Sequence, residues 1–500
     1  MIVTTREQLQ AKIDSGEILS GTIIESADLR GFERRDADLH ALVFRNVNLD
    51  NCDLAGADLG KAIFENVLFR NARLSRVSLR GATLRGCDLS AANLDHADLQ
   101  DVNLDGCCLL EALLKHADLH GCCAATANFQ AANLSGVTAS SVVLRGARLK
   151  GAQLSGAVLE DADLRGADLS AAVLDDAHLV RADLRDSNLR EANFRGAQFG
   201  RANLSGLDLS GCALQGCDLS GALLVSTQLC NASLARCDLT GADLTGADLT
   251  AADLSKSVLA KARLGNVVLD GALLSGVDLK GCKLVGAHFK NLTLNGANLA
   301  AMDLQRTRFE NTSLSRCTFV GANLAWADLS GCDLTDTDFA CATLTGACLI
   351  RARVKGAQFK RAKLTGLKAD EIVGRSVHFG GASLQDASFR DAKLESACFD
   401  DVCAETTDFS GARLAESWFS RANLKGAQFA DADLAYSNFS HACLHGANFD
   451  RANLHFANLH AASGTIACSV AADLRGVRGT DVDLLEAETY IPVANVRSGS

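Results

Sequence analysis

Proline and aromatic residues are scarce in this chain of 500 residues. Pro492 is the single proline, and Phe, Trp and Tyr together make up 5% of the sequence. A globular core of large interlocking rings is therefore not expected, even though 48% of the residues are hydrophobic. Leu and Ala supply most of that hydrophobicity, which indicates a narrow core of small and medium side chains.

Long apolar runs and strong charge are also missing. No run of about 18 apolar residues occurs, and the first residues, MIVTTREQLQAKIDSG, lack the features of a secretory signal. We therefore expect a cytoplasmic protein that does not insert into a membrane. The 19 cysteines are scattered along the chain, which favours reduced thiols over a disulfide framework. A net charge of −11 over this length argues against nucleic-acid binding by the whole surface.

A period of five residues runs through almost the whole sequence. Stepping by five from Ile24 to Leu484 visits 93 positions, and 84 of these hold Leu, Phe, Ile or Val. No exception shifts the register of the later repeats, and no linker interrupts the pattern. The exceptions are Arg34, Ala124, Ala139, Ala369, Gly374, Ala404, Gly464, Ser469 and Gly479.

Each repeat predicts one short extended side and one corner. A small residue usually lies two positions before the central residue, with Asp or Asn between them. In extended backbone, residues two apart face the same side, so the small and central residues point inward and the Asp or Asn points outward. The last two positions, which often include Gly, must turn the chain before the next repeat.

This pattern resembles the pentapeptide-repeat family, whose motif is matched by Ala57, Asp58, Leu59, Gly60 and Lys61. The resemblance implies an all-β fold, a right-handed quadrilateral β-helix in which four repeats make one coil. The chain is then a long, uninterrupted member of about 23 coils.

A coil of twenty residues has independent support from the spacing of phenylalanine. One series recurs every twenty residues, and a second series is offset by ten, which places it on the opposite side of the coil. The first is Phe319, Phe339, Phe359, Phe379, Phe399, Phe419 and Phe439, and the second is Phe389, Phe409, Phe429 and Phe449. We expect two facing core ladders of aromatic rings.

Residues 1–18 predict a helical cap over the open edge of the first coil. Thr4 or Thr5 can serve as the N-cap, Leu9 can face the first coil, and Gly16 can end the helix. A continuous solenoid is then expected over 19–486.

The expected solenoid has a thinned core near 367–376, where two consecutive central positions hold Ala369 and Gly374. A C-terminal tail over 487–500 follows it, with little amphipathic character. The helical cap over the first coil predicts a monomer. The last coil has no comparable cap, which permits an end-to-end dimer.

Seven basic residues with no acidic residue between them precede the thinned core. By register they all point outward from the sides of one coil, so they form what we call the basic collar. Arg353 is expected over Asp333, and Arg351 under Glu371. One interpretation is a solvated, partly paired ring, and the other is a docking site for an acidic partner. The collar consists of Arg351, Arg353, Lys355, Lys360, Arg361, Lys363 and Lys368.

Cysteine and histidine do not predict a metal centre. Cysteine often takes the small inward position, where it substitutes for Ala as a buried hydrophobe. His96 and His116 are expected to stack on the surface. Several histidines crowd the last coils, where two imidazoles and a neighbouring carboxylate could hold a metal, although solvent-facing side chains are the commoner outcome. These are His441, His445, His455 and His460.

No catalytic motif is present in the sequence. We therefore expect no enzyme and no cofactor, but a rigid rod that acts as a protein-interaction scaffold or adaptor. The family resemblance implies two sharper versions: a partner of bacterial secretion or effector machinery, or a mimic of duplex DNA that binds DNA gyrase or topoisomerase. The second fits less well, because those proteins are shorter and more uniformly acidic, and their dimers form through an apolar C-terminal helix.

Overall fold

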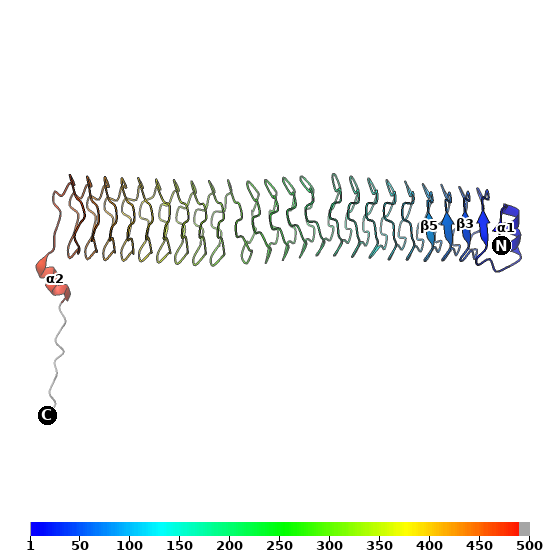
Figure 1. The fold of residues 1–500 in the computed structure, drawn as a ribbon, viewed down its shortest axis with the longest axis horizontal. Coiled ribbons are helices and arrows are strands. Elements are labelled where there is room, and N and C mark those ends of the chain that lie inside the picture. Colours follow the sequence, from blue (N-terminus) through cyan, green and yellow to red (C-terminus); the bar gives the residue numbers. More distant parts are fainter. Residues whose placement is uncertain (1, 490–500) are drawn as a thin grey trace, which may run out of the picture. The chain divides into compact units, whose positions relative to one another are not determined.

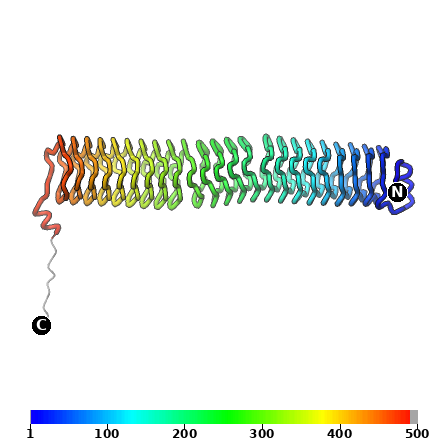
Figure 2. The backbone as a smooth tube through the Cα atoms, viewed as in Figure 1, coloured from blue at the N-terminus to red at the C-terminus, as the bar shows by residue number. Residues whose placement is uncertain are grey.

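The computed structural model describes residues 2–489, which fall into two compact units. Unit 1 covers residues 1–282 and unit 2 covers residues 283–500. Each unit is built from stacked coils (Figures 1 and 2). Most of the predicted C-terminal tail lies outside the described residues.

Backbone hydrogen bonds define a coil of twenty residues. Parallel bridges join residues twenty apart, as in Asp28 and Asn48. Leu29 N–H donates to Asn48 O at 2.7 Å, and Asn48 N–H donates to Ala27 O at 3.1 Å. Corners are closed by β-turns, such as the one in which Phe32 N–H donates to Leu29 O at 2.9 Å. The predicted β-helix with four repeats per coil is confirmed.

Unit 1 begins with a parallel sheet on one side of its first coils. Its strands follow one another in chain order. The sequence pattern missed β1, which adds a strand before the first full coil by pairing Ile2 with Ile23. The strands are β1 (Ile2–Val3), β2 (Ile23–Glu25), β3 (Val43–Arg45), β4 (Ile63–Glu65) and β5 (Thr83–Arg85).

The predicted capping helix is α1 (Arg6–Asp14). Thr5 is its N-cap, and the Thr5 hydroxyl accepts a hydrogen bond from Gln8 N–H at 3.3 Å. Leu9 is 1% exposed. Gly16 follows the helix with a φ of +71°, the left-handed conformation that ends helices at low cost.

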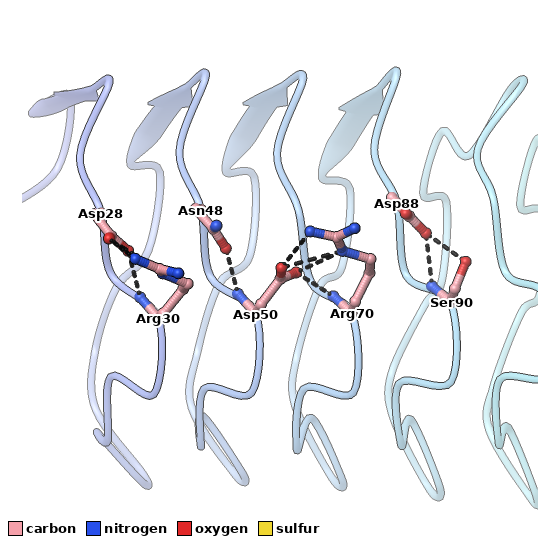
Figure 3. A network of polar contacts seen from close by, with 7 residues as sticks. All are labelled: Asp28, Arg30, Asn48, Asp50, Arg70, Asp88 and Ser90. Atoms are coloured by element: carbon pink, nitrogen blue, oxygen red, sulfur yellow. Dashed lines mark hydrogen bonds and ion pairs between the residues drawn. The ribbon is translucent and has the colours of Figure 1, made fainter.

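The recurring outward Asp and Asn side chains support the turns of the repeat. Asn48 Oδ1 accepts a hydrogen bond from Asp50 N–H at 2.9 Å, and Asp88 Oδ1 accepts one from Ser90 N–H at 3.0 Å (Figure 3). Arg70 adds a link between coils by donating to Asp50. This local bonding is an Asx-type turn, so the abundance of these carboxylates has a structural cause.

Several polar residues at the small inward position donate to backbone carbonyls of the preceding coil. Cys237 Sγ donates to Leu214 O at 2.8 Å, and Thr337 Oγ1 donates to Leu314 O at 2.9 Å. All 19 cysteines are free thiols and ten are buried. A buried hydroxyl or thiol is tolerated at such positions because a carbonyl oxygen of the preceding coil accepts its hydrogen bond.

Unit 2 contains the two phenylalanine ladders. Ring centroids in the first ladder lie 4.9 Å apart at Phe319 and Phe339, and 4.7 Å apart at Phe379 and Phe399. The second ladder also stacks, and the two meet edge to face, with 5.5 Å between the centroids of Phe379 and Phe389. Stacked and edge-on rings both contribute beyond their buried area.

The C-terminal boundary of the solenoid differs from the expected one. The last bridge joins Asn458 to Arg478, and α2 (Val482–Thr489) follows (Figure 1). Residues 482–486 are therefore helical rather than part of a coil. Gly464 and Gly479 stand at central positions and contribute no side chain to the core, so the coil pattern weakens here. Asp481 acts as the N-cap of α2, because its Oδ1 accepts a hydrogen bond from Leu484 N–H at 3.1 Å. No residue of α2 is buried. Among the described residues, no helix is both long and apolar enough to cross a membrane.

Candidate functional site

The basic collar is exposed on unit 2. All seven of its side chains face outward from the coil. The structure distributes them over different sides, because Arg353, Lys363 and Lys368 belong to separate columns of bridged residues. The collar therefore does not act as one patch, and its members have different surroundings.

Arg351 is paired across adjacent coils, as the register predicts. Its Nε lies 3.0 Å from Glu371 Oε2, and a second nitrogen lies 3.2 Å from Glu371 Oε1. The Arg351 guanidinium holds the pKa of Glu371 below its ordinary value. Arg351 is thus partly neutralised and is a poor candidate for binding a partner.

Arg353 is not paired, although Asp333 is its bridge partner on the preceding coil. Asp333 Oδ1 accepts hydrogen bonds from Thr335 N–H at 3.1 Å and from Thr335 Oγ1 at 2.6 Å. Within the described residues, no ion pair at 4 Å or less involves Arg353 or Lys355 of the collar, or Lys393 two coils further on. These three cations are available to an external anion.

A depression of about 430 Å³ brings these cations together on one side of unit 2. Its wall contains four cationic side chains and a single carboxylate, Glu395, which lies 3.9 Å from Arg375. Val373 contributes an apolar floor and is 46% exposed. The depression is lined by Arg353, Lys355, Val373, Gly374, Arg375, Lys393 and Glu395, which we call the basic depression.

Gly374 lies in the lining of the basic depression. It occupies a central position, where other repeats place a large side chain inward. A Cβ atom on Gly374 would lie 2.7 Å from Lys355 N and from Val354 C, so the backbone of the preceding coil leaves no room for a side chain at this position. In the flanking coil, Ala357 N–H closes the turn to Val354 O at 3.0 Å. The corresponding bond after Gly374 is missing among the described residues, and its turn is open.

The basic depression shares only Arg353 and Lys355 with the predicted collar. Sequence reasoning grouped basic residues by their proximity along one coil and so missed Arg375 and Lys393. The signal that finds them is the twenty-residue register, since residues 353, 373 and 393 form one column and residues 355, 375 and 395 form the next. A thinned core was expected, but its effect on the surface was not.

The structure places most of the histidines on the surface, as expected, but His460 is buried, with 5% of its surface exposed. His96 and His116 stack with 5.3 Å between ring centroids. His441 and His460 converge on Glu488 of α2, with ligand atoms within 4.8 Å of one another. His445 instead lies 3.2 Å from the Thr465 hydroxyl. The ten buried cysteines lie in the core, and several of them donate to a backbone carbonyl, as Cys237 does to Leu214 O.

A four-sided solenoid of five-residue repeats defines the class of this protein. Its sequence matches the family model described as pentapeptide repeats over residues 35–109, 127–366 and 375–463. The chain belongs to the pentapeptide-repeat family. The unmatched segment 367–374 ends at Gly374, so the basic depression lies where the repeat departs from its family pattern.

Solved structures of other repeat proteins show similarity over parts of the chain. One is a trypsin-treated variant of QnrB1, a plasmid-mediated fluoroquinolone resistance protein, with 23% identity, a TM-score of 0.29, and coverage of 41% of this chain and 88% of that one. HetL, involved in heterocyst differentiation regulation in Nostoc sp. strain PCC 7120, has 27% identity, a TM-score of 0.18, and coverage of 57% and 97%.

A pentapeptide repeat protein of the Arabidopsis thaliana thylakoid lumen has 34% identity, a TM-score of 0.19, and coverage of 20% and 68%. These TM-scores are too low to carry an argument about function. Among curated proteins, none matches the sequence.

Proposed function

We propose that this protein is a non-catalytic interaction scaffold that binds an acidic segment of a partner protein at the basic depression. The observation that carries the proposal is the convergence of four cationic side chains around one carboxylate in a hollow of the wall. Three of the cations, Arg353, Lys355 and Lys393, have no ion-pair partner among the described residues. Unpaired basic groups on one face attract an acidic partner and orient its approach.

The shape of the depression favours an extended acidic segment over a compact ligand. Arg353 and Lys393 lie two coils apart in one column, about 10 Å along the solenoid axis at the spacing of hydrogen-bonded strands. Carboxylates on alternate residues of an extended peptide lie about 7 Å apart, so a short run of acidic residues can reach both cations. Val373 between them can contact an apolar side chain of the same segment.

Binding of a fluorescein-labelled peptide of Asp and Glu residues, followed by anisotropy, tests the site directly. The triple variant Arg353→Glu, Lys355→Glu, Lys393→Glu should abolish binding. The matched control Lys360→Glu, Lys363→Glu, Lys368→Glu changes the charge equally but on other sides of the coil. It should retain binding within about threefold, since exposed charges at a distance are screened by salt. Equal loss in both variants would show that net charge alone attracts the peptide.

Partner identification uses the same pair of variants. Tagged full-length protein is purified from lysate of its own cells, and co-purifying proteins are identified by mass spectrometry. A partner that is lost with the depression variant and kept with the control supports the scaffold, and a secretion component or effector among such partners would identify the pathway. Enrichment of gyrase or topoisomerase subunits by all three proteins would instead support DNA mimicry and contradict the proposal.

A further inference from the structure

A second cluster, outside the basic depression, joins α2 to the last coils of unit 2. His441 Nε2 lies 3.0 Å from Glu488 Oε2, and His460 Nε2 lies 3.4 Å from the same oxygen. His460 is 5% exposed, so its ring is held in a fixed place. The His441 and Glu488 side chains are each 38% exposed, so the cluster is open to solvent on one side.

Two of the three ligand distances are close to those between the ligands of one tetrahedral ion. With metal–ligand bonds of about 2.0–2.2 Å, two ligands of a zinc ion lie roughly 3.3 Å apart. The two contacts to Glu488 are close to this spacing, and all three ligand atoms lie within 4.8 Å of one another. The rings of His441 and His460 are inclined by 81°, so both Nε2 atoms can face one point without the rings stacking.

The chemistry of the donor set selects the kind of ion. Two imidazoles and a carboxylate suit divalent transition metals such as Zn²⁺, whereas Mg²⁺ and Ca²⁺ prefer oxygen ligands throughout. Three protein ligands leave a fourth position, and the exposed side of the cluster gives water access to it.

One hydrogen bond shows what an ion must displace. Asp481 N–H donates to His460 Nδ1 at 3.1 Å, so a neutral His460 ring carries its proton on Nε2, facing Glu488. An ion on Nε2 requires that proton to leave and Nδ1 to be protonated through solvent. The Asp481 N–H then loses its acceptor. Ion binding is thereby coupled to the first turn of α2.

We propose that His441, His460 and Glu488 bind one Zn²⁺ or similar transition-metal ion, which fastens the last turn of α2 to the solenoid and releases its first turn from His460. In the free protein the same three side chains hold α2 by hydrogen bonds alone. The inference is independent of the basic depression and of any partner bound there.

Titration of chelator-treated, full-length protein with Co²⁺ tests the site. One equivalent should give the visible absorption of a four-coordinate cobalt ion, and Zn²⁺ should displace it. His441→Ala, His460→Ala and Glu488→Gln should each weaken binding at least tenfold. His445→Ala removes a histidine of the same coils outside the cluster and should bind as the unaltered protein does. Far-ultraviolet circular dichroism checks that each variant keeps its fold.

Amide hydrogen exchange provides a second measurement, because an ion bound loosely to the surface would not change these exchange rates. With Zn²⁺ bound, the Asp481 amide should exchange faster and the amides near Glu488 more slowly. No saturable binding at millimolar Zn²⁺ would overturn the proposal, as would binding that all three variants retain. If saturation with Zn²⁺ left the exchange of the Asp481 amide and of the amides near Glu488 unchanged, the ion would bind elsewhere and the proposal would be overturned.

Discussion

Asp333 and Arg353 are bridge partners on adjacent coils of unit 2, yet Asp333 directs its carboxylate to Thr335 instead of to Arg353. The hydroxyl and the amide of Thr335 both donate to Asp333 Oδ1. Asp333 Oδ1 is thus held by a local turn contact, and within the described residues no ion pair at 4 Å or less joins Asp333 to Arg353.

Thr335→Val should weaken binding of the acidic peptide. The substitution removes the hydroxyl donor, so the carboxylate of Asp333 can turn to Arg353. An exposed ion pair contributes about 0.2–1 kcal/mol, which corresponds to a loss of affinity on the order of two- to fivefold. Thr245→Val removes the equivalent hydroxyl contact to Asp243 in unit 1 and should leave the affinity unchanged. Equal effects of both substitutions, measured by anisotropy, would contradict this account of Arg353.

Gly374→Ala should destabilise unit 2 by about 1–3 kcal/mol, the usual cost of forcing an extra carbon into a packed core. Its Cβ would lie 2.7 Å from Lys355 N and Val354 C, both backbone atoms. Gly380 is the control, because a Cβ there meets its nearest atom only at 3.8 Å. Gly380→Ala should be neutral or slightly stabilising. Urea unfolding followed by circular dichroism compares the two, and equal stabilities would show that the backbone at Gly374 yields freely.

Phe399 has four ring neighbours and should be among the most sensitive positions of the ladders. It stacks on Phe379 and Phe419 at 4.7 and 4.8 Å, and meets Phe389 and Phe409 edge to face. Aromatic pairs contribute about 0.5–1.5 kcal/mol each beyond burial. Phe399→Leu should therefore lower the unfolding free energy of unit 2 by about 2 kcal/mol or more.

Phe449→Leu provides the comparison at the end of the second ladder. Phe449 stacks only on Phe429, at 5.0 Å, and has one edge contact, with Phe439. Its replacement should cost about half as much, because half as many ring contacts are lost. Denaturation followed by the fluorescence of Trp418 reports on the same coils. Equal losses at Phe399 and Phe449 would mean that ring burial, and not stacking, stabilises the ladders.

The coil was predictable from sequence because its geometry repeats. A period of five fixes which residues point inward, and phenylalanine spaced by twenty reports the number of sides, as the stacked Phe379 and Phe399 show. The position of Arg351 beside Glu371 follows from the same register. Wherever one contact is set by translation along the solenoid, sequence spacing is enough to find it.

Features that break the repeat were harder to predict from the sequence. The depression at Gly374 is lined by residues of adjacent coils, and a missing side chain in the sequence does not say what form the surface takes around it. The α2 helix depends on Asp481 as N-cap at the point where the core runs out. Arg353 does not pair with its register neighbour Asp333, whereas Arg263 lies 3.5 Å from Asp243 in the same register. Spacing alone therefore does not decide which ion pairs form.

The Asp53–Arg35 pair of unit 1 predicts a dependence of stability on acid pH. Asp53 is 9% exposed at its side chain, and an Arg35 nitrogen lies 2.6 Å from its Oδ2. The Arg35 guanidinium lowers the pKa of Asp53 in the folded state. A lowered pKa stabilises the fold above the unfolded value of about 3.9, and this contribution is lost as the pH falls through the folded value.

Arg35→Gln should raise the pKa of Asp53 toward its ordinary value and move acid unfolding of the first coils to higher pH. Arg30→Gln is the matched control: Arg30 also lowers the pKa of its partner, Asp28, but the Asp28 side chain is 58% exposed. Water and salt screen that exposed pair, so its loss should shift the transition much less. Amide exchange of the first coils, measured between about pH 2 and 6, resolves the two transitions. Because both variants remove one positive charge, equal shifts would assign the effect to net charge and contradict a specific contribution from the buried Asp53 carboxylate.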